Sequence, residues 1–246
     1  IVNDDAIIIN GNSGDFISGA HISSYMPQGC KHDADTMISN YIDKHYSLWK
    51  CLKTEGNIKM ISSQLKSYVN DIMEESDLPL DLLWAVGENM EWIGRQTKLV
   101  SATQRSYEFH GYEWRLPLWD PVFMDFWEGV PYKHKNNQKI YKDMLFENNW
   151  GDVWRNIDVN DYKISSSYLK LLRTILKLPF LLLGKESWHT FDKRFFAYYL
   201  DNSAASAIVP YAKVILDNGG ARNRNSWLMK KYLFEKGINI NKHKFT

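Results

Sequence analysis

A short apolar run near the start of the chain, Ala6 to Ile9, limits the folds that are open to it. The run contains three consecutive isoleucines and shows no alternation of polar and apolar residues. Such a run is typical of a strand buried on both faces, and strands of this kind usually lie in parallel sheets. Because each flank of a buried strand must pair with another strand, the run predicts an α/β domain.

The remaining sequence is dominated by helical patterns and contains no second convincing strand. Apolar residues recur at helical spacing over 35–51 and 58–73, and Pro79 opens a longer pattern that extends to Ile93. Asp120 and Pro121 form a second helix start, ahead of an apolar face that extends to Val130. Further helices are expected over 138–146, 166–178, 191–202, 204–217 and 226–236. We therefore expect the partner strands to lie upstream of Ile1, in a longer α/β protein.

The bulk composition excludes several classes of function. Thirty basic residues against 29 acidic ones give a formal net charge of +1, which makes no general case for binding nucleic acid. Two cysteines, Cys30 and Cys51, form no CxxC pair and suit a reducing compartment. The first residues lack the basic and apolar segments of a signal peptide, so we expect a soluble, cytoplasmic protein.

The longest apolar stretch, Ile175 to Leu183, contains Lys177 and Pro179 and is about half as long as a membrane span. No transmembrane segment is therefore expected. Packing in the core or against a second subunit is the favoured interpretation. A position on a membrane surface stays open because basic residues flank the stretch, namely Lys170, Arg173, Lys177 and Lys185.

A glycine-containing loop, Asn10 to Asp15, follows the predicted strand. Glycine lets the backbone approach a phosphate closely, and the next helix adds its positive end, so the N–H groups of 11–14 can face an anion. Asp15 would then be a natural Mg²⁺ ligand. The alternative is a hairpin turn at Asn10 and Gly11, but no alternating strand follows it. Taken alone, the loop leaves both interpretations open.

Two more motifs follow the loop in a fixed order. The first, E-W-R-L-P-L-W-D, spans Glu113 to Asp120, with Val-Pro at 130–131, and the second, K-D-M-L, spans Lys142 to Leu145. Together with the loop they resemble the C-terminal half of the synthetase domain in the asparagine synthetase family. That family shows a strand and S-G-x-G-x-D-E, then E-x-R-x-P-[FL]-x-D, then a Lys before a short apolar run. The resemblance covers roughly residues 5 to 150.

The resemblance implies the mostly helical C-terminal part of a nucleotide-hydrolase-type fold (HUP-like, adenine nucleotide alpha hydrolase), with few strands in this chain. It divides the chain into a strand and phosphate loop (1–28), a helical insertion (29–78), helices that match the family pattern (79–150) and a helical C-terminal subregion (151–246). The family's pyrophosphate loop, S-G-G-x-D-S, is absent from these residues and normally lies upstream of this region. A glutaminase domain, where present, also lies upstream.

The activity implied by the resemblance is that of an ATP pyrophosphatase. ATP activates a substrate carboxylate as an acyl-adenylate, pyrophosphate leaves, and an amine or ammonia attacks the acyl carbon. The form G-D-F-I-S-G-A-H-I looks most similar to asparagine synthetase-like proteins of bacterial surface-polysaccharide biosynthesis, the lipopolysaccharide type included. For these, a sugar carboxylate such as a uronic acid is the implied substrate.

The resemblance also assigns roles to individual residues. Asp15 resembles the second Mg²⁺-binding aspartate of the family, and Lys142 resembles the lysine that holds the triphosphate. Glu113 and Arg115 look like the family's buried ion pair, which shapes the site. Apart from the resemblance, two roles are open for His21: contact with substrate, or, as the favoured interpretation, a position on the surface or beside the site. The phosphate would contact the backbone of four loop residues, Gly11, Asn12, Ser13 and Gly14.

Two departures from the family pattern lie in the loop itself. Asn12 stands where asparagine synthetases carry Glu and β-lactam synthetases carry Tyr, and an amide cannot act as a general base. Phe16 replaces the Glu that usually follows the Asp. These departures favour the alternative function, a non-catalytic helical module for binding or scaffolding that descends from the same fold.

Three other groups of residues have a structural interpretation that outweighs the functional one. A set of potential metal ligands lacks the spacing of a structural zinc site and is better read as a polar loop with Asp35 as helix cap: His21, Cys30, His32, Asp33 and Asp35. The stretch 219–225 is read as a turn between helices, with phosphate or sugar-acid binding through its arginines as the alternative. Most of the ten tryptophans are expected in the core, with stacking on sugars as the alternative.

Overall fold

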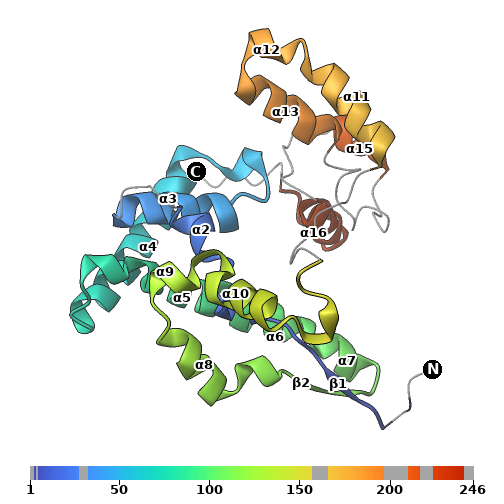
Figure 1. Cartoon of the computed structure of the whole chain (residues 1–246). Helices are drawn as coiled ribbons and strands as arrows, with labels where there is room; N and C mark the ends of the chain where they lie inside the picture. Colours follow the sequence, from blue (N-terminus) through green and yellow to red (C-terminus); the bar gives the residue numbers. More distant parts are fainter. Residues whose placement is uncertain are drawn as a thin grey trace. The chain divides into compact units, whose positions relative to one another are not determined.

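The computed structural model describes Asn3, residues 5–27, 33–156, 166–196, 210–216 and 224–240 (Figure 1). The chain divides into two compact units, the first formed by residues 1–44 and 61–159 and the second by 45–60 and 160–246. The described residues are mostly helical, and the first unit also contains a small parallel sheet, a composition compatible with an α/β fold.

The sheet pairs two strands that lie far apart in the sequence. Strand β1 (Ile7–Ile9) runs parallel to β2 (Glu113–Arg115), with Ile8 opposite Trp114. The strand at 6–9 and its parallel pairing are thus confirmed, but the expectation that no partner lies within this chain is wrong. A three-residue strand is too short to show a periodicity, which is why β2 went unrecognised inside the E-W-R motif.

The expectation that β1 is buried on both faces is also wrong among the described residues. Ile7 is 50% exposed and Ile9 is 67% exposed, whereas Ile8 between them is half-buried. The physical reason is the width of the sheet, because a ribbon of two strands gives β1 one neighbour and little cover.

Short helices make up most of the first unit. They are α1 (Gly14–Ile17), α2 (Ile22–Tyr25), α3 (Ala34–His45), residues 61–75 of α4 (Glu55–Glu75), η2 (Leu80–Leu82), α5 (Leu83–Glu91), η3 (Trp92–Val100), α6 (Ser101–Thr103), α7 (Arg105–Phe109), η4 (Pro117–Trp119), α8 (Pro121–Glu128), α9 (Tyr132–Lys135), η5 (Asn136–Gln138), α10 (Lys139–Asn148) and η6 (Trp150–Asp152). The predicted start at Asp120 is confirmed, because its side chain accepts a hydrogen bond of 3.0 Å from the Val122 N–H at the start of α8.

Two apolar clusters hold these helices in place. The larger one gathers residues of α2, α3, α4 and α5 around Tyr25, which is fully buried. Gly87 of α5 packs so tightly that an added Cβ would lie 2.5 Å from the Tyr25 ring. The smaller cluster joins Phe16 and Ile17 of α1 to Trp127 of α8 and to Val130. Together they fix the segment from α1 to α2, which carries the residues considered below.

The second unit is built from η1 (Lys50–Leu52), the first turn of α4, and the helices α11 (Ser167–Lys177), α12 (Phe180–Leu183), α13 (Lys185–Phe195), α15 (Tyr211–Leu216) and α16 (Arg224–Glu235). Helix α13 begins before the predicted residue 191, because Gly184 adopts a φ of +88° and lets a new helix follow α12 directly. The predicted helical residues 197–202 and 204–209 lie outside the described part. Arg173 of α11 binds Asp192 of α13 through two hydrogen bonds of 2.7 Å.

Helices α11 and α12 present an exposed apolar surface. Leu171, Leu178 and Leu182 are among the exposed side chains, and Leu182 is 95% exposed. Of the two expectations for this stretch, packing in the core is wrong for most of its residues, because within it only Leu176 and Phe180 are partly buried, and Phe180 meets Trp188 and Phe191. A contact with a second subunit stays a prediction. Among the described residues, no helix combines the length and the apolar character needed to cross a membrane.

Candidate functional site

The loop that follows β1 lies at the carboxyl end of the parallel strand pair, where open α/β sheets bind their ligands. The N–H of Asn10 donates to the carbonyl of Arg115 and continues the ladder by one bond of 3.0 Å. The Asn10 side chain donates to Gln104 Oε1 at 3.1 Å and to the Tyr107 hydroxyl at 3.2 Å. Gln104, between α6 and α7, and Tyr107 of α7 therefore fix the start of the loop.

Hydrogen bonds within the loop define its conformation. The N–H of Asn12 donates to Asn10 Oδ1 at 2.9 Å, and the N–H of Gly14 donates to the Gly11 carbonyl at 3.4 Å. Ser13 adopts a left-handed φ of 72°, and its buried hydroxyl donates to Gln96 Oε1 at 2.7 Å. Two of the N–H groups expected to face a phosphate are thus already engaged, which leaves a smaller phosphate contact than the sequence predicts.

Asp15 follows in the first turn of α1, with its side chain 59% exposed. The chain then turns at Gly19, which adopts a φ of +91° at a point where an added Cβ would overlap the carbonyl group of Lys135. Only glycine fits this turn without strain. The turn brings His21 back against the side chain of Asp15.

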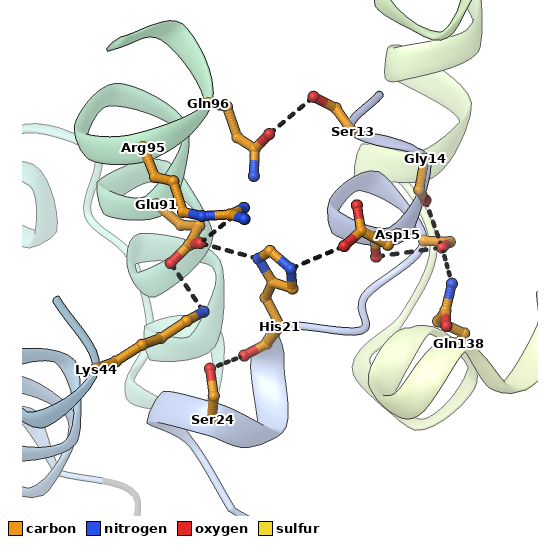
Figure 2. A network of polar contacts seen from close by, with 11 residues as sticks. Ser13, Gly14, Asp15, His21, Ser24, Lys44, Glu91, Arg95, Gln96 and Gln138 are labelled. Atoms are coloured by element: carbon orange, nitrogen blue, oxygen red, sulfur yellow. Dashed lines mark hydrogen bonds and ion pairs between the residues drawn. The ribbon is translucent and has the colours of Figure 1, made fainter. Parts of the chain in front are cut away.

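His21 bridges two carboxylates of different depth (Figure 2). Its Nε2 lies 3.0 Å from Asp15 Oδ2, and its Nδ1 lies 2.9 Å from Glu91 Oε1. Glu91, the last residue of α5, is fully buried and also meets Lys44 Nζ at 3.0 Å and Arg95 at 3.7 Å. Three cationic groups therefore surround one buried carboxylate, which compensates the cost of removing its charge from water.

The same contacts set the protonation states at the site. The hydrogen bond with His21 lowers the pKa of Asp15, although burial acts in the opposite direction. Burial by itself would lower the pKa of His21, but the hydrogen bonds with Asp15 and Glu91 outweigh it and raise that pKa. The two shifts together widen the pH range over which an ionised Asp15 faces a protonated His21.

A π-helical segment, η3, supplies two more polar groups. Arg95 and Gln96 lie on it next to Glu91, and π-helical turns are frequent at functional sites. Gln96 is fully buried, and its Nε2 has no hydrogen-bond partner in the part of the chain that the structure describes. In Figure 2 this nitrogen points to the side of the network where Arg95 and His21 lie. Unpartnered buried donors are rare and call for an acceptor.

The structure brings together some of the predicted residues and not others. Asp15, His21 and the 11–14 loop form one site. Glu113 and Arg115 do pair, at 2.9 Å, but their side chains are 68% and 59% exposed rather than buried, because β2 lies at an open edge. Lys142 is half-buried in α10, and among the described residues it makes no hydrogen bond or ion pair with Asp15.

Neighbouring helices nevertheless connect the start of α10 to the loop region. The Gln138 amide donates to the Ser18 hydroxyl at 2.7 Å, and the Ser18 hydroxyl donates to the Gly14 carbonyl at 2.6 Å. An added Cβ on Gly14 would also lie 2.7 Å from Leu118 of η4. The loop is thus held by segments that the E-W-R-L-P motif and the region before Lys142 provide.

The group of potential metal ligands in the loop before α3 has another role. Asp33 caps this helix, accepting hydrogen bonds from the N–H and the hydroxyl of Thr36 at 2.8 and 3.0 Å. Asp35, the predicted cap, instead pairs with Lys66 at 2.7 Å. Cys30, His32 and residues 219–223 lie outside the described part of the chain. Within the described residues, no three His, Cys, Asp or Glu side chains form a group that could hold a metal by themselves.

Sequence reasoning missed the residues that support the site from α3, α5 and η3. The burial of Glu91 could have been predicted from the sequence, because Glu91 falls on the same helical face as Trp84, Gly87 and Met90, all of which are buried. A charged residue on an apolar face indicates a buried ion pair or a site. Gln96 had no such signal, because its direction depends on the π-helical register.

Comparisons with known proteins found no relative of this chain. No family model matches the chain, and neither a curated protein nor a solved structure matches it.

Proposed function

We propose that the chain is the C-terminal part of an ATP-dependent amide ligase that activates a carboxylate by adenylation, as the asparagine synthetase family does. The observation that carries the proposal is the placement of Asp15. Its carboxylate is exposed, has a lowered pKa, and lies just beyond the carboxyl end of two parallel strands. This is where α/β proteins bind nucleotides, and Mg²⁺ on a nucleotide needs only one or two protein carboxylates.

The donor groups around Asp15 fit Mg²⁺-ATP better than they fit a metal held by protein alone. Asp15 supplies a single exposed carboxylate, with one oxygen bonded to His21, so phosphate oxygens must complete the coordination. Arg95 and the Nε2 group of Gln96, which has no hydrogen-bond partner among the described residues, lie near it and provide donors for anionic oxygens. When bound, Mg²⁺ would neutralise charge on the departing pyrophosphate, with Lys142 proposed as the second positive group.

We assign proton transfer to His21, which can accept a proton only in its neutral form and with one ring nitrogen released from its carboxylate partner. Asn12, at the position of the family's general base, has an amide that cannot accept a proton from an amine. His21 is bonded to Asp15 on one side and to buried Glu91 on the other, which fixes the orientation of its ring. A carboxylate that orients a histidine is a common arrangement in acid–base catalysis.

The remaining parts of the proposal concern substrates and a further segment. A sugar carboxylate as the activated substrate and an amine or ammonia as the nucleophile follow from the resemblance alone. A segment that carries the S-G-G-x-D-S loop would add a strand beside β1. The exposure of Ile7 and Ile9 supports it, because apolar strand residues are normally covered. An enzyme that consumes ATP in this way fits the cytoplasm.

The test is carboxylate-dependent exchange of labelled pyrophosphate into ATP by the full-length protein. Asp15→Asn and Lys142→Ala are each expected to lower the exchange rate about a hundredfold or more, since each removes a charge that faces the phosphates. Asp125→Asn, on α8, is the matched control and is expected to leave the rate unchanged. Exchange that persists in both site variants would exclude this mechanism.

A non-catalytic binding or scaffolding module is the second candidate. It is favoured by Asn12 and by the packing of Phe16, whose ring is buried against Trp92 with centroids 6.1 Å apart. Calorimetry with Mg²⁺-ATP on the full-length protein separates the two candidates. A ligase is expected to bind the nucleotide in a magnesium-dependent way, with affinity lost in Asp15→Asn, whereas a scaffold is not.

A further inference from the structure

A cavity of about 290 Å³ lies in the first unit, bounded by α1, α5, α8 and α9. Its walls are aromatic, with Phe16, Trp84, Trp92 and Trp127 among them, and none of the residues assigned above to ATP lines it. The volume is at the lower end of the range for small-molecule sites, so a ligand for this cavity must be small.

The carboxylate of Glu88, in the cavity wall, has a hydrogen-bond partner for only one of its two oxygens among the described residues. Glu88 Oε2 accepts a hydrogen bond of 2.7 Å from Lys135, whose side chain is buried. Glu88 Oε1 is buried and has no hydrogen-bond partner in the described part of the chain. A buried carboxylate oxygen without a donor is costly, and a ligand that carries a donor would relieve that cost.

The protonation behaviour of Glu88 agrees with this incomplete compensation. Burial raises the pKa of Glu88 to about 7, although Lys135 and His21 act to lower it and Glu128 raises it further. The existing ion pair is therefore too weak to hold the carboxylate ionised well below neutral pH. A second cation beside Oε1 would lower the pKa again.

Charge and wall chemistry together indicate the class of ligand. The cavity contains two carboxylates, Glu88 and Glu128, against the single ammonium of Lys135. That ammonium already lies 5.5 Å from the centroid of the Trp84 ring, in a cation–π contact. Aromatic walls with an excess of negative charge favour a cation, whereas a neutral ligand would leave the excess negative charge of the two carboxylates in place.

We propose that this cavity binds a small organic cation, a primary ammonium on an apolar or aromatic body, with the ammonium held at the Glu88 carboxylate and the body packed against the tryptophans. The proposal is independent of the ATP-dependent activity assigned to the Asp15 site. It concerns binding alone and requires no covalent step.

Calorimetry on the full chain at pH 8 tests the class of ligand with two probes of nearly equal shape. We expect 2-phenylethylammonium to bind saturably and 2-phenylethanol to bind at least about tenfold more weakly, the loss expected for one charged hydrogen bond. Equal binding of both probes, or no binding of the ammonium, would overturn the proposal.

Variants test the contact with Glu88. Glu88→Gln is expected to weaken 2-phenylethylammonium about tenfold or more. Glu88→Gln leaves Lys135 buried without its partner, so it is also combined with Lys135→Met. The double variant is expected to lose the same affinity for 2-phenylethylammonium and to unfold at about the same temperature as the wild type. Glu74→Gln, exposed on α4, is the matched control with unchanged affinity. Undiminished affinity in the folded double variant would contradict the assignment.

Proton release gives a signature that a purely structural role of Glu88 would not produce. At pH 7 the bound cation is expected to displace a proton from Glu88, so the measured heat should differ between buffers of low and high ionisation enthalpy. His21, Lys135 and Glu128 face the same carboxylate, so the same experiment on the double variant identifies the source. A proton release that persists there would assign the titration to another group and refute the role of Glu88.

Discussion

The Nε2 atom of His21 lies 3.0 Å from the Oδ2 atom of Asp15, although Asp15 belongs to α1 and His21 precedes α2. The contact depends on a reversal of the chain between the two helices and on buried Glu91, which binds the other nitrogen of the His21 ring at 2.9 Å. Stability, protonation and chemistry at this site are therefore linked through one imidazole.

Replacing His21 by Gln should change how stability depends on pH. The pKa of His21 is raised by folding, so its stabilising contribution is fully present below the unfolded value of about 6.5 and is lost as the pH rises through the folded pKa. Urea unfolding at pH 6 should show His21→Gln less stable than wild type by about 1 to 3 kcal/mol, with a smaller difference at pH 9. His110→Gln, at the exposed end of α7, should show no such difference, and a gap that widens toward pH 9 would contradict the sign.

Gly19 should be irreplaceable where Gly11 is not. Alanine at position 19 meets both a φ of +91° and a clash with the Lys135 backbone, whereas a Cβ at Gly11 meets nothing within 4 Å. We expect Gly19→Ala to lower the free energy of unfolding by about 2 to 4 kcal/mol and Gly11→Ala by less than about 0.5 kcal/mol. Denaturant unfolding of the two variants measures this, and equal costs would show that the turn adapts.

Much of the helical framework could be predicted from the sequence, because apolar spacing and capping residues act locally. Asp120 before Pro121 and the pattern over 58–73 each specify a helix without reference to distant parts of the chain. The strand at Ile7–Ile9 could be predicted for a similar reason, since a run of isoleucines favours strands.

The candidate site could be predicted only where its residues are close in sequence. Asp15 and His21 lie in one loop and one turn, so both were found. Glu91, Lys44 and Gln96 reach the site through tertiary packing and a π-helical register, and neither leaves a local pattern. The partner of β1 was missed for the same reason, because three residues carry too little periodicity to identify a strand.

The apolar surface of α11 and α12 should contribute little to the stability of the second unit. Leu182 is 95% exposed, so Leu182→Ser should change the free energy of unfolding by less than about 0.5 kcal/mol. Trp188 is buried against Phe180, and Trp188→Ala should cost about 3 to 5 kcal/mol. Thermal unfolding of both variants tests the contrast, and a large loss for Leu182→Ser would mean that this surface is covered in solution.

The charges around Glu91 should move the pKa of His21 in opposite directions. Glu91 raises this pKa through a hydrogen bond and its negative charge, whereas the positive charge of Lys44 lowers it. In an NMR titration of the imidazole, Glu91→Gln should therefore lower the pKa of His21 and Lys44→Met should raise it. Glu91→Gln should also destabilise the fold by about 3 to 5 kcal/mol, because Lys44 loses its buried partner. If the pKa of His21 shifted in the same direction in both variants, the hydrogen bonds around Glu91 would have to rearrange when either residue is replaced.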